Sequence, residues 1–319
     1  MFGKMMNRFY YGKSGKGDYT TDDLPETRWQ LFWEMLRVRF TALFKLNLIY
    51  MVAWIPAMLV IGRGLTMGYS GLAHITELQM SGADAQQISQ TALQYQDVMK
   101  GVILQTLLLL VPAIGITGPF TAGAAYVTRN WARDEHSFLW SDFWETVKGN
   151  WKPALLTSFI TGLVPLFLYV CFTFYGMMAQ TMPVFYAAQI FCVMLGVLWL
   201  MSLMYIYPQL VTYDTKYIGV VKNSLLMVVG CLPITAGLKL LSIVPAVICA
   251  AVCLLTPYAL YAMLVYGLYY VLLGFALSRF VGASCSNAVF DRYINVKIEG
   301  VQVGRGLHQE EEDEETFEA

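Results

Sequence analysis

Aromatic and aliphatic residues recur at helical spacing in two similar stretches of the chain. The first stripe contains Trp29, Phe32, Trp33, Leu36 and Phe40, and the second contains Trp140, Phe143, Trp144, Val147 and Trp151. Spacings of three, four and seven residues place each set on one face of a helix. Each stretch leads directly into a long apolar segment, which predicts an interfacial helix that turns into a membrane span.

The large aromatic side chains of these elbow helices are predicted to lie in the headgroup region of a bilayer. The predicted interfacial anchors are Trp29, Phe32, Trp33, Trp140, Phe143, Trp144 and Trp151. A fainter copy of the pattern follows, with Tyr217, Val221 and Leu225 at apolar positions and Lys222 at the basic one. Elbow helices are therefore predicted over about 25–40, 138–152 and 214–226.

Six apolar segments have the length of membrane spans. The first, residues 41–61, would extend ~31 Å at about 1.5 Å per residue, which matches the hydrocarbon thickness of a bilayer. Residues 101–127, 154–175 and 184–207 form the next three, and Pro257 divides the long apolar block 232–281 into the last two. Each elbow and the hairpin after it make one unit, so three elbow-plus-hairpin repeats are predicted. Residues 63–100 form the one long connection, a polar outer segment rich in Gln whose second half has helical periodicity.

Composition agrees with this pattern. Hydrophobic residues make up 57% of the chain and charged residues 13%, with a mean hydropathy of +0.52. Ordinary soluble domains have roughly a quarter charged residues, so we predict an all-α, polytopic membrane protein whose six-span membrane domain covers residues 25–281. The six cysteines include no CxxC pair, so neither a metal site nor a cofactor is expected. No nucleic-acid partner is expected either.

Basic residues are distributed unevenly between the two sides of the predicted bundle. Seven Lys and Arg precede the first span, four lie between spans two and three, two between spans four and five, and four follow span six, counted from Arg279. The other side has only Arg63 and Lys100. The positive-inside rule therefore predicts that both termini are cytoplasmic. Residues 1–24 become a basic cytoplasmic arm, and residues 282–319 a cytoplasmic tail with a disordered acidic end.

The second predicted span is unusual in its small residues and prolines, which are Pro112, Gly115, Gly118, Pro119 and Gly123. Small residues allow helices to approach closely in a bilayer, and proline kinks a helix. This pattern is typical of a tight packing element, but interrupted helices also build the binding sites of transporters.

Few polar residues fall within the predicted spans. The candidate polar or substrate-facing residues are Lys45, Asn47, Gln105, Thr121, Gln189 and Lys239. Lys45 lies one turn inside its span and can extend its amine to the interface. No predicted span contains His, Asp or Glu, so no catalytic residues are assigned and no enzymatic activity is expected.

Short motifs resemble a known family of bacterial membrane proteins. They are Gly118-Pro119-Phe120-Thr121-Ala122, Arg129, Asp142-Phe143-Trp144, Lys148 and Leu46-Asn47-Leu48. These residues are similar to the YesL-like family of uncharacterised integral membrane proteins, over most of residues 30–280. The resemblance implies a location in the plasma membrane of a bacterium and a gene encoded beside sugar-uptake transporters, with no assigned activity.

Two functions remain open from the sequence. An accessory or scaffold protein needs flat helix faces, interfacial anchors and soluble tails, and all three are predicted. We therefore expect an accessory protein associated with carbohydrate uptake or sensing, whose partners are the lipid bilayer and a sugar transporter or solute-binding lipoprotein. The alternative is a solitary small-solute transporter or permease-like protein. That role needs a polar path, because each unmet buried polar group costs about 1–3 kcal/mol.

Overall fold

The computed structural model describes residues 24–308, and these residues form helices joined by turns and short connections. The all-α prediction is confirmed for this part of the chain, which contains no strand. The predicted basic arm lies outside the described residues except for Leu24, and so does the acidic end of the predicted tail.

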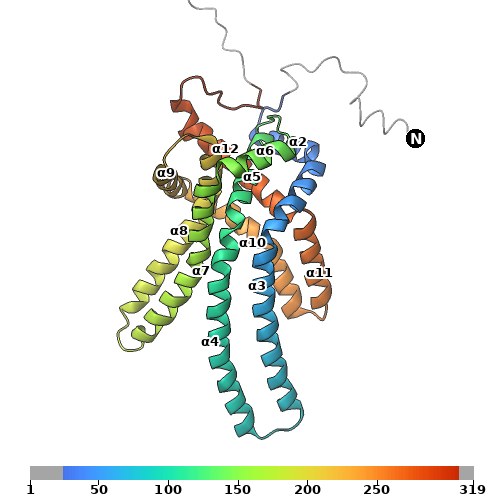
Figure 1. Cartoon of the computed structure of the whole chain (residues 1–319), viewed down its shortest axis with the longest axis vertical. Helices are drawn as coiled ribbons and strands as arrows, with labels where there is room; N and C mark the ends of the chain where they lie inside the picture. Colours follow the sequence, from blue (N-terminus) through green and yellow to red (C-terminus); the bar gives the residue numbers. More distant parts are fainter. Residues whose placement is uncertain (1–23, 309–319) are drawn as a thin grey trace, which may run out of the picture.

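Three helical hairpins extend from one end of the molecule (Figure 1). They pair α3 (Phe40–Met80) with α4 (Ala85–Gly115), α7 (Trp151–Ala179) with α8 (Phe185–Thr212), and α10 (Leu232–Leu255) with α11 (Ala259–Tyr269). A short helix precedes each hairpin, namely α2 (Arg28–Val38), α6 (Leu139–Gly149) and α9 (Tyr217–Gly230). The three short helices lie at the end of the molecule where the described chain starts and stops (Figure 1).

The hairpin helices have the length and composition of membrane spans. Six helical segments of the described chain are long and apolar enough to cross a bilayer, the sixth running from Ala259 to Lys297. Large apolar side chains on these segments point outward, such as Leu59, which is 69% exposed, and Ile190, also 69% exposed. Because a lipid environment accepts such side chains while all backbone groups are paired within helices, the prediction of a polytopic protein with six spans is confirmed at this level.

The outer segment differs from its prediction. Its second half is helical in α4, as its periodicity predicted, but its first half is helical too: α3 continues without interruption to Met80 and α4 begins at Ala85, so only a four-residue turn joins them. Helix α3 has 41 residues and is ~60 Å long at about 1.5 Å per residue, roughly twice the hydrocarbon thickness of a bilayer. The Tyr95 hydroxyl donates to the Gly68 carbonyl at 2.8 Å and joins the two extensions. We call residues 63–100 the arm; this segment is distinct from the predicted basic arm at the N-terminus.

The second predicted span is divided at a single residue, Ile116, whose backbone keeps helical angles. Helix α4 ends at Gly115, one turn after Pro112, and α5 (Thr117–Trp131) begins at Thr117. The Ile116 N–H still donates to the Pro112 carbonyl at 3.1 Å, so the chain turns without losing all of its backbone bonds. Pro119 lies in the first turn of α5, where a missing N–H costs nothing. The break ends the membrane span early and leaves α5 as a separate helix.

Helix α5 is the central element of the bundle. Twelve of its 15 residues are buried. A Cβ atom added to Gly118 would lie 2.2 Å from the Ala154 carbonyl oxygen, and one added to Gly123 would lie 2.9 Å from Phe143. The small residues of this stretch therefore permit close contact with α6 and α7.

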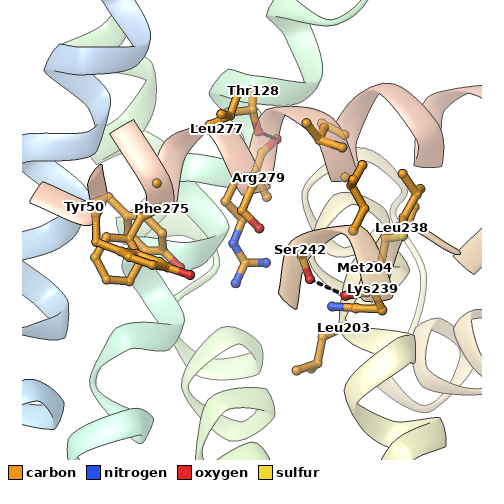
Figure 2. Close-up of a pocket in the computed structure, with 18 of the residues that line it drawn as sticks. Tyr50, Thr128, Leu203, Met204, Leu238, Lys239, Ser242, Phe275, Leu277 and Arg279 are labelled. Atoms are coloured by element: carbon orange, nitrogen blue, oxygen red, sulfur yellow. Dashed lines mark hydrogen bonds between the residues drawn. The ribbon is translucent and has the colours of Figure 1, made fainter. Parts of the chain in front are cut away.

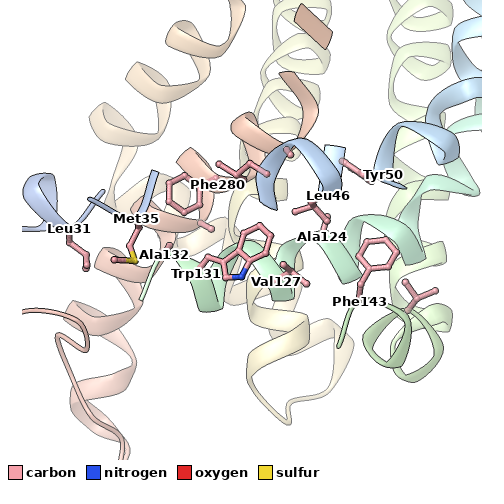
Figure 3. Packing of buried hydrophobic residues seen from close by; sticks show 14 residues of the cluster. Leu31, Met35, Leu46, Tyr50, Ala124, Val127, Trp131, Ala132, Phe143 and Phe280 are labelled. Carbon is pink, nitrogen blue, oxygen red and sulfur yellow. The ribbon is translucent and has the colours of Figure 1, made fainter. Parts of the chain in front are cut away.

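The largest cluster of buried apolar side chains surrounds α5 near the end of the bundle that carries the short helices (Figure 3). It includes Trp131 from α5, Leu46 from α3, Phe143 from α6 and Phe280 from α12 (Phe275–Tyr293). Four elements far apart in the sequence thus share one core. This core lies at the end of the bundle opposite the hairpin turns.

The last helix continues past the predicted span boundary at residue 281. A five-residue π-helix, η2 (Tyr270–Gly274), follows α11, and α12 then crosses the upper part of the bundle obliquely to Tyr293 (Figure 1). The short 3₁₀ helix η3 (Asn295–Lys297) ends this stretch. Phe290 and Asp291 of α12 are 1% and 3% exposed. The first part of the predicted tail is therefore packed into the membrane domain.

Candidate functional site

A cavity of about 380 Å³ lies among α3, α5, α8, α10, η2 and α12. Aromatic residues form much of its wall, including Tyr50 and Trp54 from α3 and Phe275 from α12. Two basic residues, Lys239 from α10 and Arg279 from α12, also line it. Figure 2 shows the Lys239 amine and the Arg279 guanidinium directed into the same space. The volume falls within the usual range of small-molecule sites, about 300–1,000 Å³.

Arg279 lies beside two aromatic rings. Its guanidinium carbon is 5.9 Å from the Tyr50 ring centroid and 5.6 Å from the Tyr207 centroid. The ring faces attract the cation, but they provide no oxygen for its N–H groups. Among the described residues, no hydrogen bond or ion pair is formed by the guanidinium. Its five donors therefore remain open to a ligand.

The two aromatic partners of Arg279 are themselves held by hydrogen bonds. The Thr121 hydroxyl donates to the Thr117 carbonyl at 2.8 Å, so it must accept the 2.8 Å bond from the Tyr50 hydroxyl. The Tyr207 and Ser158 hydroxyls are 2.6 Å apart. Helices α5 and α7 thus fix the rings, and the rings fix the position of Arg279.

Asn47 positions the start of α12. Its side-chain amide donates to the Tyr270 carbonyl at 2.9 Å and to the Val271 carbonyl at 2.8 Å, and its oxygen accepts from the Ala276 N–H at 2.9 Å. A π-helical turn misaligns the backbone bonds of a helix, and this one buried amide satisfies the groups at both ends of the turn. Arg279 follows less than one turn after Ala276, so Asn47 directs it to the cavity.

Lys239 comes from a helix that packs loosely. Thr235 is the one buried residue of α10, and α11 has none. The Lys239 side chain is half-buried, and its amine forms no hydrogen bond or ion pair with any described residue. The Ser242 hydroxyl donates at 2.7 Å to the Lys239 backbone carbonyl, which leaves the amine itself unengaged.

The charge balance of the cavity is positive. No Asp or Glu is among the described residues that line it, and the charges of Lys239 and Arg279 repel each other. The buried indole N–H of Trp54, another wall residue, also has no hydrogen-bond partner among the described residues. Removing a cation from water without a counter-ion costs several kcal/mol, of the order of 3 or more. The arrangement is suited to receiving an anion.

Of the six polar residues predicted to face a substrate, the structure places only Lys239 in the cavity wall. Asn47 and Thr121 are buried and bonded to protein groups beside it. Gln189 donates to the Phe172 carbonyl at 2.8 Å between α7 and α8. Lys45 and Gln105 are exposed on the outer surface, where Gln105 accepts from Arg63 at 3.1 Å. The predicted set is therefore dispersed, and three of its six members, Asn47, Thr121 and Gln189, join helices to one another.

The predicted interfacial anchors divide into two groups. Trp29, Trp33, Trp140 and Trp151 are 50–68% exposed, as an anchor in a headgroup region would be. Phe143 is fully buried, and Phe32 and Trp144 pack against the same core cluster. Because the Phe143 ring contacts Phe120 and Trp144 inside the protein, its position differs from the one predicted at the interface.

Arg279, Tyr50 and Tyr207 were not identified as site residues from the sequence. The charge count placed Arg279 with the loop residues after the sixth span, whereas it lies in the cavity wall. The sequence feature that points to Arg279 is its position within a mainly apolar stretch, which runs from Phe275 to Val281. An arginine within an apolar stretch of a membrane protein marks a functional-site candidate.

Comparison with known proteins gives one match. Residues 100–172 match the model of a family described as "Protein of unknown function, DUF624". This region covers the second half of α4, all of α5 and α6, and most of α7, and YesL-like proteins carry the same domain. No curated protein and no solved structure matches the chain.

Proposed function

We propose that this chain is an accessory membrane protein of the bacterial plasma membrane, which binds a small molecule in the cavity and acts through a partner. The observation that carries the proposal is the pair of unengaged cations, Lys239 and Arg279, facing one cavity. Placing two cations in such a cavity raises the free energy of the folded protein unless a ligand or ion occupies the site. The resemblance to YesL-like proteins extends the proposal to carbohydrate uptake or sensing.

An accessory role is favoured over transport by the state of the other polar groups. The side chains of Asn47, Thr121 and Gln189 form hydrogen bonds with protein atoms, which leaves them unavailable to a solute. Lys45 and Gln105 face outward. A carrier of a hydrated solute needs a series of available partners across the bilayer, and the described residues supply them only at the cavity.

The proposed topology places both termini and the three short helices in the cytoplasm. In support, the His308 N–H donates to the Pro25 carbonyl at 3.0 Å, so the two ends of the described chain meet on one side. The basic residues gather at the same end. We further propose that each short helix and its hairpin form one of three repeats. The arm then projects outside the cell, where a sugar transporter or solute-binding lipoprotein could contact it.

The test removes the arm and keeps the bundle. A variant in which residues 66–95 are replaced by a short Gly-Ser turn is expected to fold and to lose its partner in cross-linking and co-purification from cells. The full chain, with Tyr95→Phe as a matched control that keeps the arm, should capture a transporter subunit or lipoprotein. If the full chain captures neither and the purified protein alone moves sugar into liposomes, the accessory role is wrong.

One observation favours the second candidate, a solitary carrier. Both helix interruptions, at Ile116 and at η2, lie in elements that adjoin or form the cavity wall. Discontinuous helices build the sites of secondary transporters. Solute flux into liposomes that is lost in Lys239→Met, with normal protein levels, would support the carrier.

A further inference from the structure

We infer that the cavity binds a phosphate group, held between the Arg279 guanidinium and the Lys239 amine. The inference rests on the proposed function, since it names the ligand class of the same cavity. It begins with the donors: Arg279 offers five N–H groups and Lys239 three, and none of them is bonded to a described residue. An anion with several oxygens is the partner that such a set lacks.

The geometry favours an anion shared by two helices. Tyr50 and Tyr207 hold the guanidinium by cation–π contacts at 5.9 and 5.6 Å, which leave its N–H donors unused. A guanidinium fork binds two oxygens of one anion at once, whereas an ammonium binds as a point charge. Phosphate has enough oxygens for the fork and the amine together, while a carboxylate has two, which the fork alone can occupy.

The wall residues near the two cations also suit a phosphate group. Ser278 lines the cavity from α12, and its exposed hydroxyl forms no hydrogen bond with a described residue. A phosphate monoester carries up to two negative charges at neutral pH, which would balance the two cations. The cavity of about 380 Å³ has room for more than a bare ion, so the phosphate can belong to a larger molecule.

Two sources can supply this chemistry, a soluble phosphate compound and the headgroup of phosphatidic acid, a lipid whose phosphate is also a monoester. The wall includes Leu241 and Ser242 on the exposed side of the loosely packed helix α10. A lipid could enter between α10 and α12, and a solute could enter from the aqueous side. The experiment therefore has one arm for each source.

The full-length protein is placed in nanodiscs of pure phosphatidylcholine, and thermal unfolding is followed with inorganic phosphate, with acetate at equal ionic strength, or with phosphatidic acid added to the lipid. We expect phosphate, phosphatidic acid or both to raise the unfolding temperature, and acetate to have little effect. Radiolabelled phosphate binding, or lipid retention measured by mass spectrometry, gives the affinity.

Variants make the test specific to the cavity. Lys239→Met and Arg279→Gln should each weaken binding about tenfold or more, because each removes a charge-assisted bond. Lys239→Arg should retain most of it and so control for misfolding. Lys45→Met, which removes an exposed lysine from α3, should leave binding unchanged. A response to phosphate alone identifies a soluble ligand, and a response to phosphatidic acid alone identifies a lipid.

Three results would overturn the inference: no response to either phosphate source, an equal response to acetate, or equal weakening by Lys45→Met. The proposed function fails separately. If phosphate does not bind but Lys239→Met still disrupts the partner complex, the cavity receives another ligand and only the phosphate assignment is wrong. If phosphate binds but the full chain captures no partner, the site stands and the accessory role is wrong.

Discussion

The Asn47 side-chain oxygen accepts a hydrogen bond from the Ala276 N–H at 2.9 Å, across 229 residues of sequence. With its two donated bonds to the Tyr270 and Val271 carbonyls, Asn47 joins the first long helix to the interrupted end of the last span. A residue that the sequence suggested for substrate contact is thus fully used in supporting the backbone. Its role is to hold the helix that carries Arg279.

Replacing Asn47 by Leu should therefore destabilise the bundle. The change removes the side-chain partner of the Tyr270 and Val271 carbonyls and of the Ala276 N–H at a buried position, and we expect a loss of about 2–4 kcal/mol. The midpoint of thermal unfolding in detergent measures it. Gln105→Leu is the matched control, because Gln105 is exposed and bonds only Arg63; equal effects of the two changes would contradict the assigned role.

Gly118→Ala tests the close contact between α5 and α7. The added Cβ would lie 2.2 Å from the Ala154 carbonyl oxygen and 2.7 Å from its carbon, which are backbone atoms that cannot rotate away. We expect a loss of about 3 kcal/mol or failure to fold. Gly101→Ala is the control, since no neighbouring atom lies within 4 Å of the position that its methyl group would take, and Ala favours a helix over Gly. A neutral Gly118→Ala would show that the two helices are farther apart.

Phe143 and Trp140 separate core packing from membrane anchoring. Phe143 is fully buried, so Phe143→Ala should cost about 3–5 kcal/mol in detergent and in a bilayer alike. Trp140 is 65% exposed, so Trp140→Ala should have a small effect in detergent and a larger one in nanodiscs, where an interfacial aromatic side chain is at its preferred depth. Unfolding temperatures in the two media provide the comparison. Similar losses for both variants in detergent would contradict the division.

Hydropathy was sufficient to predict the helical class and the number of spans, because bilayer thickness fixes the length of an apolar helix. It predicted helical structure only for the second half of the arm, because the polar and glycine residues that follow Arg63 look like a loop when α3 and α4 are not known to pack against each other. In the second span, proline and glycine predicted a kink, and the helix is divided there at Ile116. The residue at which the division falls depends on how α5 packs, which the sequence does not show.

The candidate site was predicted only in part. Lys239 was identified because a lysine within a span is conspicuous, and the structure places it in the cavity wall. Arg279 was assigned to a loop, because its neighbours in sequence give no sign that α12 folds back across the bundle. Tyr50 and Tyr207 have ordinary aromatic positions in apolar helices. Their contact with Arg279 follows from the tertiary fold, which a single sequence does not reveal.

Cysteine labelling tests the proposed orientation. In a background without the six native cysteines, Ser81→Cys in the exposed turn of the arm should react with a membrane-impermeant thiol reagent in intact cells. Thr215→Cys, exposed between α8 and α9 at the other end, should react only after permeabilisation. The positive-inside rule gives this direction. Labelling of Thr215→Cys alone in intact cells would invert the topology. Because both sites are exposed, burial cannot explain an absence of labelling at either one.

The last prediction concerns the ion pair between Arg28 and Asp291, whose atoms Nη2 and Oδ2 are 2.8 Å apart and which links α2 to α12. Asp291 is 3% exposed and also accepts from the Gly304 N–H at 3.2 Å, so the carboxylate joins the first helix, the last helix and the segment after it. Asp291→Ala should cost about 3 kcal/mol, because it leaves several partners unpaired at a buried position. Arg28→Ala should cost less, about 1 kcal/mol, since the arginine is 39% exposed and water can replace part of its interaction.

A double-mutant cycle isolates the Arg28–Asp291 pair, with Asp97 and Lys100 as a control pair. The control pair has a similar distance, 2.9 Å, but its side chains are 79% and 70% exposed, so a coupling near zero is expected. Unfolding midpoints of the wild type, the two single variants and the double variant give each coupling free energy. We expect a coupling of about 1 kcal/mol or more for Arg28–Asp291, and we expect it to decrease only slightly in high salt, because Asp291 is shielded from solvent ions. Equal coupling in the two pairs would mean that burial of Asp291 does not strengthen the contact, and that apolar contacts such as that of Phe32 with Phe280 hold α2 to α12.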